Sequence, residues 1–173
     1  LRRQRQMCIR DRVQLRAQKS KIAENGTVTH YPADDGEGLD AACDIGTTTV
    51  VCHLIDGKTG EKLATVSEPS AQRSFGADVL SRIQAAEAGK LEILKEQIIF
   101  QIAQMLRTLQ KKTGRGEQIQ RLAVVGNTVM CHLFAGISPV SIGVTPFMPQ
   151  EFFGKEYTGE QLGLTDCRSV YIA

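Results

Sequence analysis

The chain has 173 residues, 42% of them hydrophobic and 23% charged, which is a globular composition and excludes a disordered or fibrous protein. Its length suffices for one hydrophobic core and is short for two. No segment approaches the roughly 18 consecutive apolar residues of a membrane helix, so we expect no membrane association. The five cysteines have no CxxC or zinc-type spacing, which favours reduced thiols in a cytoplasmic protein.

The net charge of +2 originates in the first 12 residues, LRRQRQMCIRDR, which hold five arginines and one aspartate. The rest of the chain holds 16 basic and 18 acidic side chains, so we expect no nucleic-acid partner. Because this segment lacks periodicity and an initiating methionine, we interpret residues 1–12 as a non-native tail. Residues 13–38 are polar and end in PADDGEG, which predicts the end of a preceding domain and a linker.

Three short strands are predicted next, at residues 39–45, 49–55 and 62–67. The first leads into Gly46 and three threonines, the second is closed by Asp56-Gly57, and Pro69 follows the third. Short strands joined by tight turns form an antiparallel meander.

Beyond residue 78 the hydrophobic period becomes helical. A helix is predicted from Val79 with an interruption at Gly89, and a longer helix follows that ends before Gly114. The apolar residues of the longer helix recur at three- and four-residue steps and are expected to be core: Leu91, Leu94, Ile98, Ile102, Met105 and Leu109. Residues 121–126 then predict a buried parallel strand, and residues 129–134 another helix. Residues 143–165 have no clear period, and the terminal RSVYIA predicts the beginning of a strand.

The resulting order of elements, β-β-β-α-β-α, predicts the fold class. Three antiparallel strands followed by a crossover helix into a parallel strand form the first layer of a ribonuclease-H-like α/β domain. We therefore expect residues 39–173 to be a first lobe with a mixed sheet, truncated within an element at the C-terminus.

The segment CDIGTTTVV predicts an anion site between the first two strands. Gly46 allows close backbone approach, and the N–H groups and hydroxyls of Thr47 and Thr48 can converge on phosphate oxygens. Asp44 can hold Mg²⁺ through water, because Mg²⁺ keeps much of its hydration shell. No GxxxxGK[ST] motif occurs, so the loop is not a P-loop. The alternative is an ordinary turn in which Asp44 caps the local backbone.

Three motifs in sequence carry a family resemblance: DIGTTTVV, AQRSFGADVLSRIQ and AVVGNTVMCHLFAGISPVSIGVTPFMP. Together they resemble the actin-like ATPase superfamily and, within it, the ATPase domain of the reductive activators of corrinoid proteins. The resemblance covers residues 39–173; DIGTT belongs to the whole superfamily, whereas the ordered set of three is far more specific. It implies an actin and sugar-kinase fold, ATP and Mg²⁺ as ligands, and a corrinoid protein of a methyltransferase system as partner. A homodimer is left open.

The resemblance also implies roles for individual residues. Asp44 is expected to hold the Mg²⁺, and the phosphates are expected to bind Gly46, Thr47 and Thr48. The end of the predicted parallel strand lies where ligands bind in open α/β folds, and its residues are expected to orient the attacking water or contact the γ-phosphate: Gly126, Asn127 and Thr128. The alternative is that these residues only N-cap the following helix.

Members of this family are larger than the present chain. They carry an N-terminal two-iron ferredoxin domain and further domains before the ATPase, and they restore the cobalt(I) state of inactivated corrinoid proteins. The C-x₄-C-x₂-C cluster spacing and the superfamily's second phosphate loop are absent here, so the chain resembles a fragment with weak or no ATPase activity of its own. Two rivals stay open. One is a small-molecule kinase or 2-hydroxyacyl-CoA dehydratase activator, and the other is a non-enzymatic interaction module.

Several further polar residues are interpreted as structural. His53 and His132 each adjoin a cysteine, but without a second ligand pair we expect packed or surface histidines. The cysteines in apolar runs are expected in the core: Cys43, Cys52 and Cys131. Four residues from the segment after the third strand to the first turn of the helix are weaker candidates for a functional role: Gln72, Arg73, Asp78 and Arg82. Arg73 could meet a phosphate or a partner protein, but a solvated or capping role is favoured for it.

Overall fold

The computed structural model describes residues 38–173, so the expectations for residues 1–12 and 13–37 lie outside the described residues. The strands are β1 (Leu39–Ile45), β2 (Thr49–Asp56), β3 (Lys62–Pro69), β4 (Ile119–Gly126), β5 (Lys155–Thr158) and β6 (Cys167–Ile172). The helical segments are η1 (Ala71–Phe75), α2 (Val79–Ala85), η2 (Ala86–Lys90), α3 (Leu91–Thr113), α4 (Thr128–Ala135), α5 (Val140–Gly143) and α6 (Gly159–Leu162).

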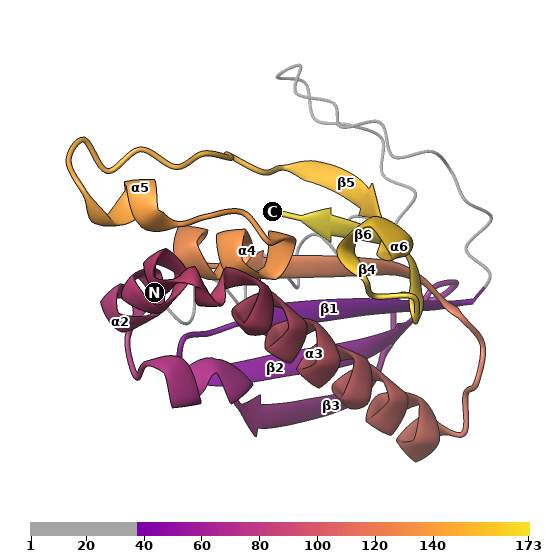
Figure 1. The fold of residues 1–173 in the computed structure, drawn as a ribbon. Coiled ribbons are helices and arrows are strands. Elements are labelled where there is room, and N and C mark those ends of the chain that lie inside the picture. Colours follow the sequence, from indigo (N-terminus) through magenta and orange to yellow (C-terminus); the bar gives the residue numbers. More distant parts are fainter. Residues whose placement is uncertain (1–37) are drawn as a thin grey trace.

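The strands form one mixed sheet in the order β3-β2-β1-β4-β6-β5 (Figure 1). β1 pairs with β2, and β2 with β3, in antiparallel fashion, whereas β4 is parallel to both β1 and β6. The predicted meander and the parallel fourth strand are therefore confirmed. The carboxyl ends of β1, β4 and β6 lie at one edge of the sheet, which is the edge where open α/β sheets bind ligands.

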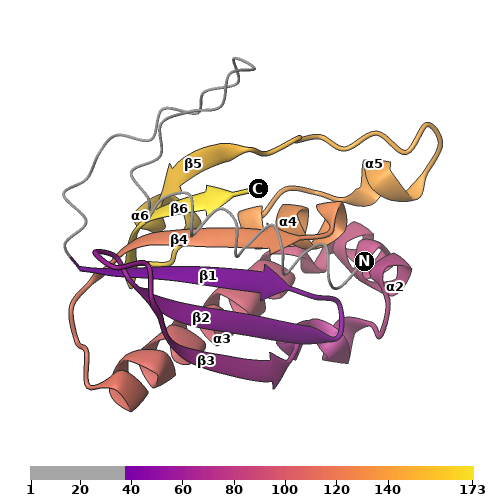
Figure 2. The same ribbon diagram turned by 180° about the vertical axis from the view of Figure 1, so that it is seen from behind.

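Helices α2, α3 and α4 cover one face of this sheet, and from behind the strands lie in front of them (Figures 1 and 2). Helix α3 makes the crossover from β3 to β4 and buries its apolar stripe: Leu94, Ile98, Ile102, Met105 and Leu109 are fully buried, while Leu91 is half-buried. The predicted core face is thus confirmed except at its first residue. Within residues 38–173 no helix is both long and apolar enough to cross a bilayer.

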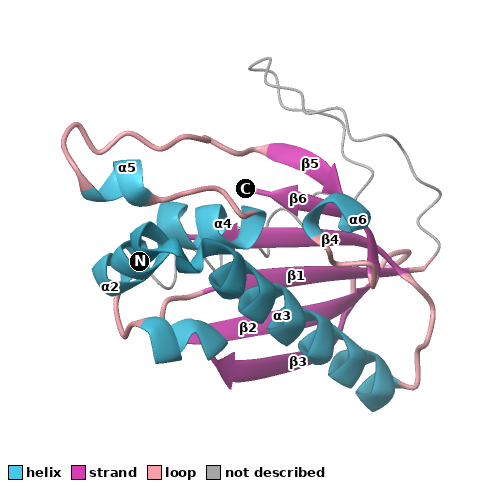
Figure 3. Ribbon diagram, viewed as in Figure 1, coloured by secondary structure: helices cyan, strands magenta, loops and turns pink. Residues whose placement is uncertain are grey.

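The helix boundaries follow the predicted signals. Gly89 has a left-handed φ of 82° and interrupts the helical run between α2 and α3, and Gly114, with φ 68°, ends α3. Three short elements were not predicted: α5, just before the segment without periodicity, and β5 and α6 within it (Figure 3). β5 is a four-residue edge strand with mostly exposed side chains, so it carries no alternation of apolar residues.

Candidate functional site

The loop between β1 and β2 is a tight turn closed by its own backbone. The Gly46 N–H donates to the Thr49 carbonyl oxygen at 3.0 Å. A Cβ atom on residue 46 would lie 2.4 Å from the same oxygen, so only glycine fits. The close approach predicted for Gly46 is therefore present, but the group that approaches is the chain itself.

Two donors from outside the loop hold its carbonyl groups. Arg82 Nη2 donates to the Thr47 carbonyl oxygen, and the Ser70 N–H donates to the Thr48 carbonyl oxygen at 2.9 Å. The N–H groups of Thr47 and Thr48 donate to no acceptor within residues 38–173. These two N–H groups are therefore available to an external acceptor.

Asp44 precedes this loop on β1. Its neighbours Cys43 and Ile45 point into the core beneath α3, so strand alternation places the Asp44 side chain on the opposite face of the sheet. The carboxylate is half-buried, and its charge contributes to raising the pKa of Cys43, although burial of that thiol is the larger cause. The side chains of Asp44 and Arg82 therefore lie on opposite faces of the sheet.

The loop after β4 lies beside the first loop, as expected. In the parallel register Asp44 pairs with Val125 and Ile45 with Gly126. A Cβ on Gly126 would lie 3.0 Å from the Ile45 carbonyl oxygen, so the strand ends approach closely. The Asn127 amide nitrogen then donates to Thr47 Oγ1 at 3.2 Å and joins the two loops.

Asn127 also performs the structural role that was its alternative reading. Its Oδ1 accepts from the Met130 N–H at 2.9 Å and so caps α4. A side-chain amide can do both, because its oxygen accepts while its nitrogen donates. Thr128 follows at the first turn of α4 and is exposed.

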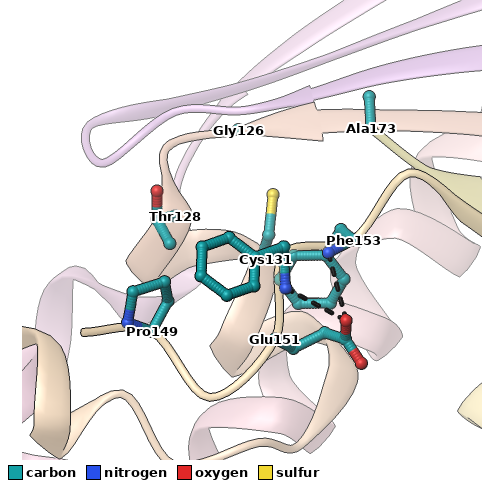
Figure 4. A pocket seen from close by; sticks show the side chains of 8 residues that line it. Gly126, Thr128, Cys131, Pro149, Glu151, Phe153 and Ala173 are labelled. Carbon is teal, nitrogen blue, oxygen red and sulfur yellow. Dashed lines mark hydrogen bonds between the residues drawn. The ribbon is translucent and has the colours of Figure 1, made fainter.

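A pocket of about 250 Å³ adjoins this second loop (Figure 4). Gly126, Thr128 and Cys131 line it from the end of β4 and from α4. The other lining residues are the last residue of the chain and four from the segment without periodicity: Ala173, Pro149, Glu151, Phe152 and Phe153. The Glu151 carboxylate accepts from the N–H groups of Phe152 and Phe153 at 3.0 and 3.3 Å, shown as dashed lines, and pairs with Lys155. These bonds lower the pKa of Glu151, the Lys155 contact being the main cause.

His132 anchors the wall of the pocket and is a packed residue, as predicted. It is fully buried, its ring meets Phe153 edge-on at 5.1 Å, and its Nδ1 lies 2.7 Å from the Thr128 carbonyl oxygen. Because Nε2 accepts from the Glu151 N–H, Nδ1 carries the proton and the ring is neutral. Burial correspondingly lowers its pKa.

The remaining interpretations of cysteine and histidine also hold for the described part of the chain. Cys43, Cys52 and Cys131 are buried, as is Cys167. His53 bonds to Thr65 Oγ1 at 2.8 Å. Among residues 38–173 no group of three or more His, Cys, Asp or Glu side chains is arranged to hold a metal ion.

Arg82 is the residue that sequence reasoning undervalued. It was only a weak candidate with no role assigned to it, yet it is fully buried and contacts the first loop directly. Its position within an apolar stretch of α2, between Val79, Ile83 and Ala86, is the signal that indicates an inward-facing side chain.

Comparison with known proteins places the chain in a family. The model of the family described as RACo middle region matches residues 39–173. The corrinoid activation enzyme RamQ of Eubacterium limosum is 33% identical over 132 residues, which are 73% of this chain and 22% of that enzyme. A solved structure described as a reductive activator for corrinoid, iron-sulfur protein is 32% identical with a TM-score of 0.74, and the match covers 81% of this chain and 23% of that one.

The chain thus spans less than a quarter of the length of these two relatives. The structural match confirms the predicted α/β fold of the actin-like type, with its mixed sheet and covering helices. Because the family model covers the whole described domain apart from Gly38, the chain belongs to the RACo middle region family.

Proposed function

We propose that this chain is part of an activator that binds and hydrolyses ATP and couples ATP turnover to the reductive reactivation of a corrinoid protein. The observation that carries the proposal is the junction of two loops at the carboxyl edge of the sheet. There Thr47 and Thr48 present N–H groups without acceptors among the described residues, and Asn127 ties the second loop to Thr47. The names of the two relatives supply the corrinoid partner.

The residues present fit a phosphate group and its metal ion. The free N–H groups of the first loop are donors for phosphate oxygens. Asp44 offers a carboxylate for a hydrated Mg²⁺, which would neutralise phosphate charge when bound. Asn127 and Thr128 stand at the neighbouring strand end, where they would orient water or contact the terminal phosphate. In this proposal the chain's own contribution is positioning and electrostatic stabilisation, with no covalent intermediate.

An iron–sulfur cluster does not fit the described part of this chain. Its four cysteines are buried in the core, and burial raises the pKa of Cys167 to about 12, which opposes the thiolate form that clusters require. A two-iron cluster would therefore be held by another part of the parent protein. The electron-transfer step itself belongs to that part and not to residues 38–173.

The test uses the complete protein encoded by the gene that contains this chain. A cob(II)alamin-containing corrinoid protein is mixed with it and a low-potential reductant, and formation of cobalt(I) is followed by absorbance with ATP, with ADP or with a non-hydrolysable ATP analogue. We expect cobalt(I) to form with ATP alone and phosphate release to accompany it. Phosphate transfer to a small molecule would identify a kinase instead, and absence of ATP binding would identify an interaction module.

A further inference from the structure

Arg82 is a buried cation that links four parts of the domain. Its side chain is fully enclosed, and it contacts groups on the first loop, on η1 and the turn after it, and on α4. The partners of its guanidinium are the Thr47 carbonyl oxygen, the Gly76 carbonyl oxygen (3.2 Å), Gln72 Oε1 (3.4 Å) and Met130 Sδ (3.2 Å). The guanidinium group has five N–H donors in one planar fork, so it can donate to four acceptors at once, which no other side chain can do.

All four partners are uncharged, and within residues 38–173 no carboxylate forms an ion pair with Arg82. Burial therefore lowers the pKa of the guanidinium, and the charge of Asp78 only partly opposes this effect. Arginine nevertheless stays protonated in proteins, so the domain carries a buried positive charge under the first loop that Asp78 offsets only in part. Such a charge is costly to bury and is stabilised when an anion binds nearby.

The contact with Thr47 also orients the peptide group. In a trans peptide unit the C=O and the following N–H point in opposite directions. Since Arg82 holds the Thr47 carbonyl from the helical side, the Thr48 N–H points away from Arg82. It thereby faces out of the loop, where it has no acceptor among the described residues.

We infer that Arg82 is a positioning residue for an anion: it sets the Thr47–Thr48 peptide so that its N–H meets a phosphate oxygen, and it supplies the buried positive charge behind that peptide. The identity of the anion as a phosphate of ATP rests on the proposed function. The orientation of the Thr47–Thr48 peptide by Arg82 does not depend on the proposed function, because it follows from the contact of Arg82 with the Thr47 carbonyl oxygen.

The residues around the start of α2 hold Arg82 in place. Gln72 is fully buried, and its amide nitrogen donates to the Leu94 carbonyl oxygen at 2.8 Å, which fixes the Oε1 that Arg82 contacts. Asp78 and Ser81 form a capping box that fixes the start of α2, and so the direction from which Arg82 enters. These residues act through Arg82 and do not meet the anion.

The test compares wild type with Arg82→Met and Arg82→Lys in the complete protein that contains this chain. Arg107→Met is the matched control, since Arg107 is a half-exposed arginine of α3 that pairs with Asp166 at the surface. The first readout is hydrogen–deuterium exchange of the Gly46 and Ser70 amides without nucleotide, because their hydrogen bonds close the loop: Gly46 donates to the Thr49 carbonyl oxygen and Ser70 to that of Thr48. We expect exchange to accelerate at least about tenfold in Arg82→Met, and to remain unchanged in the control.

The second readout is the calorimetric Kd for Mg·ATP and, separately, for inorganic phosphate. We expect Arg82→Met to weaken both by at least about tenfold, and Arg82→Lys to lie between it and wild type, because lysine keeps the charge but not the fork. If Arg82→Met does not fold, Arg82→Lys decides alone, and a wild-type Kd together with wild-type exchange overturns the inference. If wild type binds neither probe, the proposed function is wrong, and exchange alone decides whether Arg82 positions the loop.

Discussion

Two turns of this domain follow an aspartate at or near the end of a strand, yet the structure uses the two carboxylates differently. Asp56 ends β2 and closes its own turn: Oδ1 accepts from the Lys58 and Thr59 N–H groups at 3.0 and 2.8 Å and from Thr59 Oγ1 at 3.1 Å. Its Oδ2 pairs with Arg115 at 3.2 Å. The loop after Asp44 is instead held through its carbonyl groups, by Arg82 and by the Ser70 N–H.

The comparison shows what distinguishes a structural aspartate from a candidate for binding. In the turn after Asp56, the side chain consumes the N–H groups that a ligand would need. In the loop after Asp44, outside donors take the carbonyl groups, and the N–H groups of Thr47 and Thr48 have no acceptor within residues 38–173. Both turns have an aspartate followed closely by a glycine. They differ in which backbone groups are already hydrogen-bonded: the N–H groups in the turn after Asp56, and the carbonyl groups in the loop after Asp44.

The largest expected effect comes from weakening the packing of α3 on the sheet that carries both turns. Ile102 is fully buried on the face of α3 that packs against the sheet. Ile102→Ala should therefore lower the free energy of unfolding by about 2–5 kcal/mol. The measurement is chemical denaturation of the complete protein. Phe100→Ala on the same helix is the control, because Phe100 is 66% exposed and its loss should change stability by less than about 0.5 kcal/mol. Equal effects of the two substitutions would mean that α3 does not hold the sheet.

The next effect tests the comparison directly with one substitution at each turn. Asp44→Asn keeps the shape of the side chain and removes the charge that Mg²⁺ needs, so the rate of ATP hydrolysis per folded molecule should fall by about 10²-fold or more. Asp56→Asn makes the same chemical change in the other turn and should leave that rate unaltered. Equal loss of ATP hydrolysis in both variants, or full activity in Asp44→Asn, would contradict the different roles assigned to the two aspartates.

Much of the fold around the candidate site could be predicted from the sequence. The bounds of β1 at residues 39–45 follow from an apolar run that ends before Gly46, and the core face of α3 follows from its period. Residues 46–48 and 126–128 are adjacent because β1 and β4 are parallel and their carboxyl ends share one edge. These features could be predicted because each follows from the hydrophobic pattern of a short stretch of sequence.

Arg82 and the pocket could not be predicted in the same way. Arginine is mostly exposed in proteins, so its contact with Thr47, 35 residues away, becomes visible only in three dimensions. The segment after α5 has no period because β5 and α6 have four residues each. Helix α6 begins at a capping box between Thr158 and Gln161, and Leu162 is its only buried apolar side chain. Short elements fixed by side-chain bonds leave little hydrophobic pattern to find.

The smallest expected effect concerns the stability that Asp56 contributes. Asp56→Asn loses the ion pair with Arg115 and weakens the bonds to the turn, so it should lower the free energy of unfolding by about 1 kcal/mol at pH 7. Denaturation curves of the variant and wild type provide the measurement. A loss similar to that of Ile102→Ala would indicate that this turn is part of the core and not a surface closure.

The pH dependence of that difference follows from the direction of the pKa shift. The Thr59 N–H is the main cause that lowers the pKa of Asp56 from its ordinary value of 3.8, and Arg115 adds to it. Because the pKa is lower in the folded than in the unfolded state, the stabilisation is complete well above 3.8 and is lost as the pH falls through 3.8 toward the folded value. The stability curves of wild type and Asp56→Asn should therefore run parallel near pH 7 and converge below about pH 4. Curves that stay apart below about pH 4 would show that the shape of the Asp56 side chain, and not its charge, stabilises the turn. The charge of Asp56 would then have no structural role to set against the proposed role of Asp44 in binding Mg²⁺.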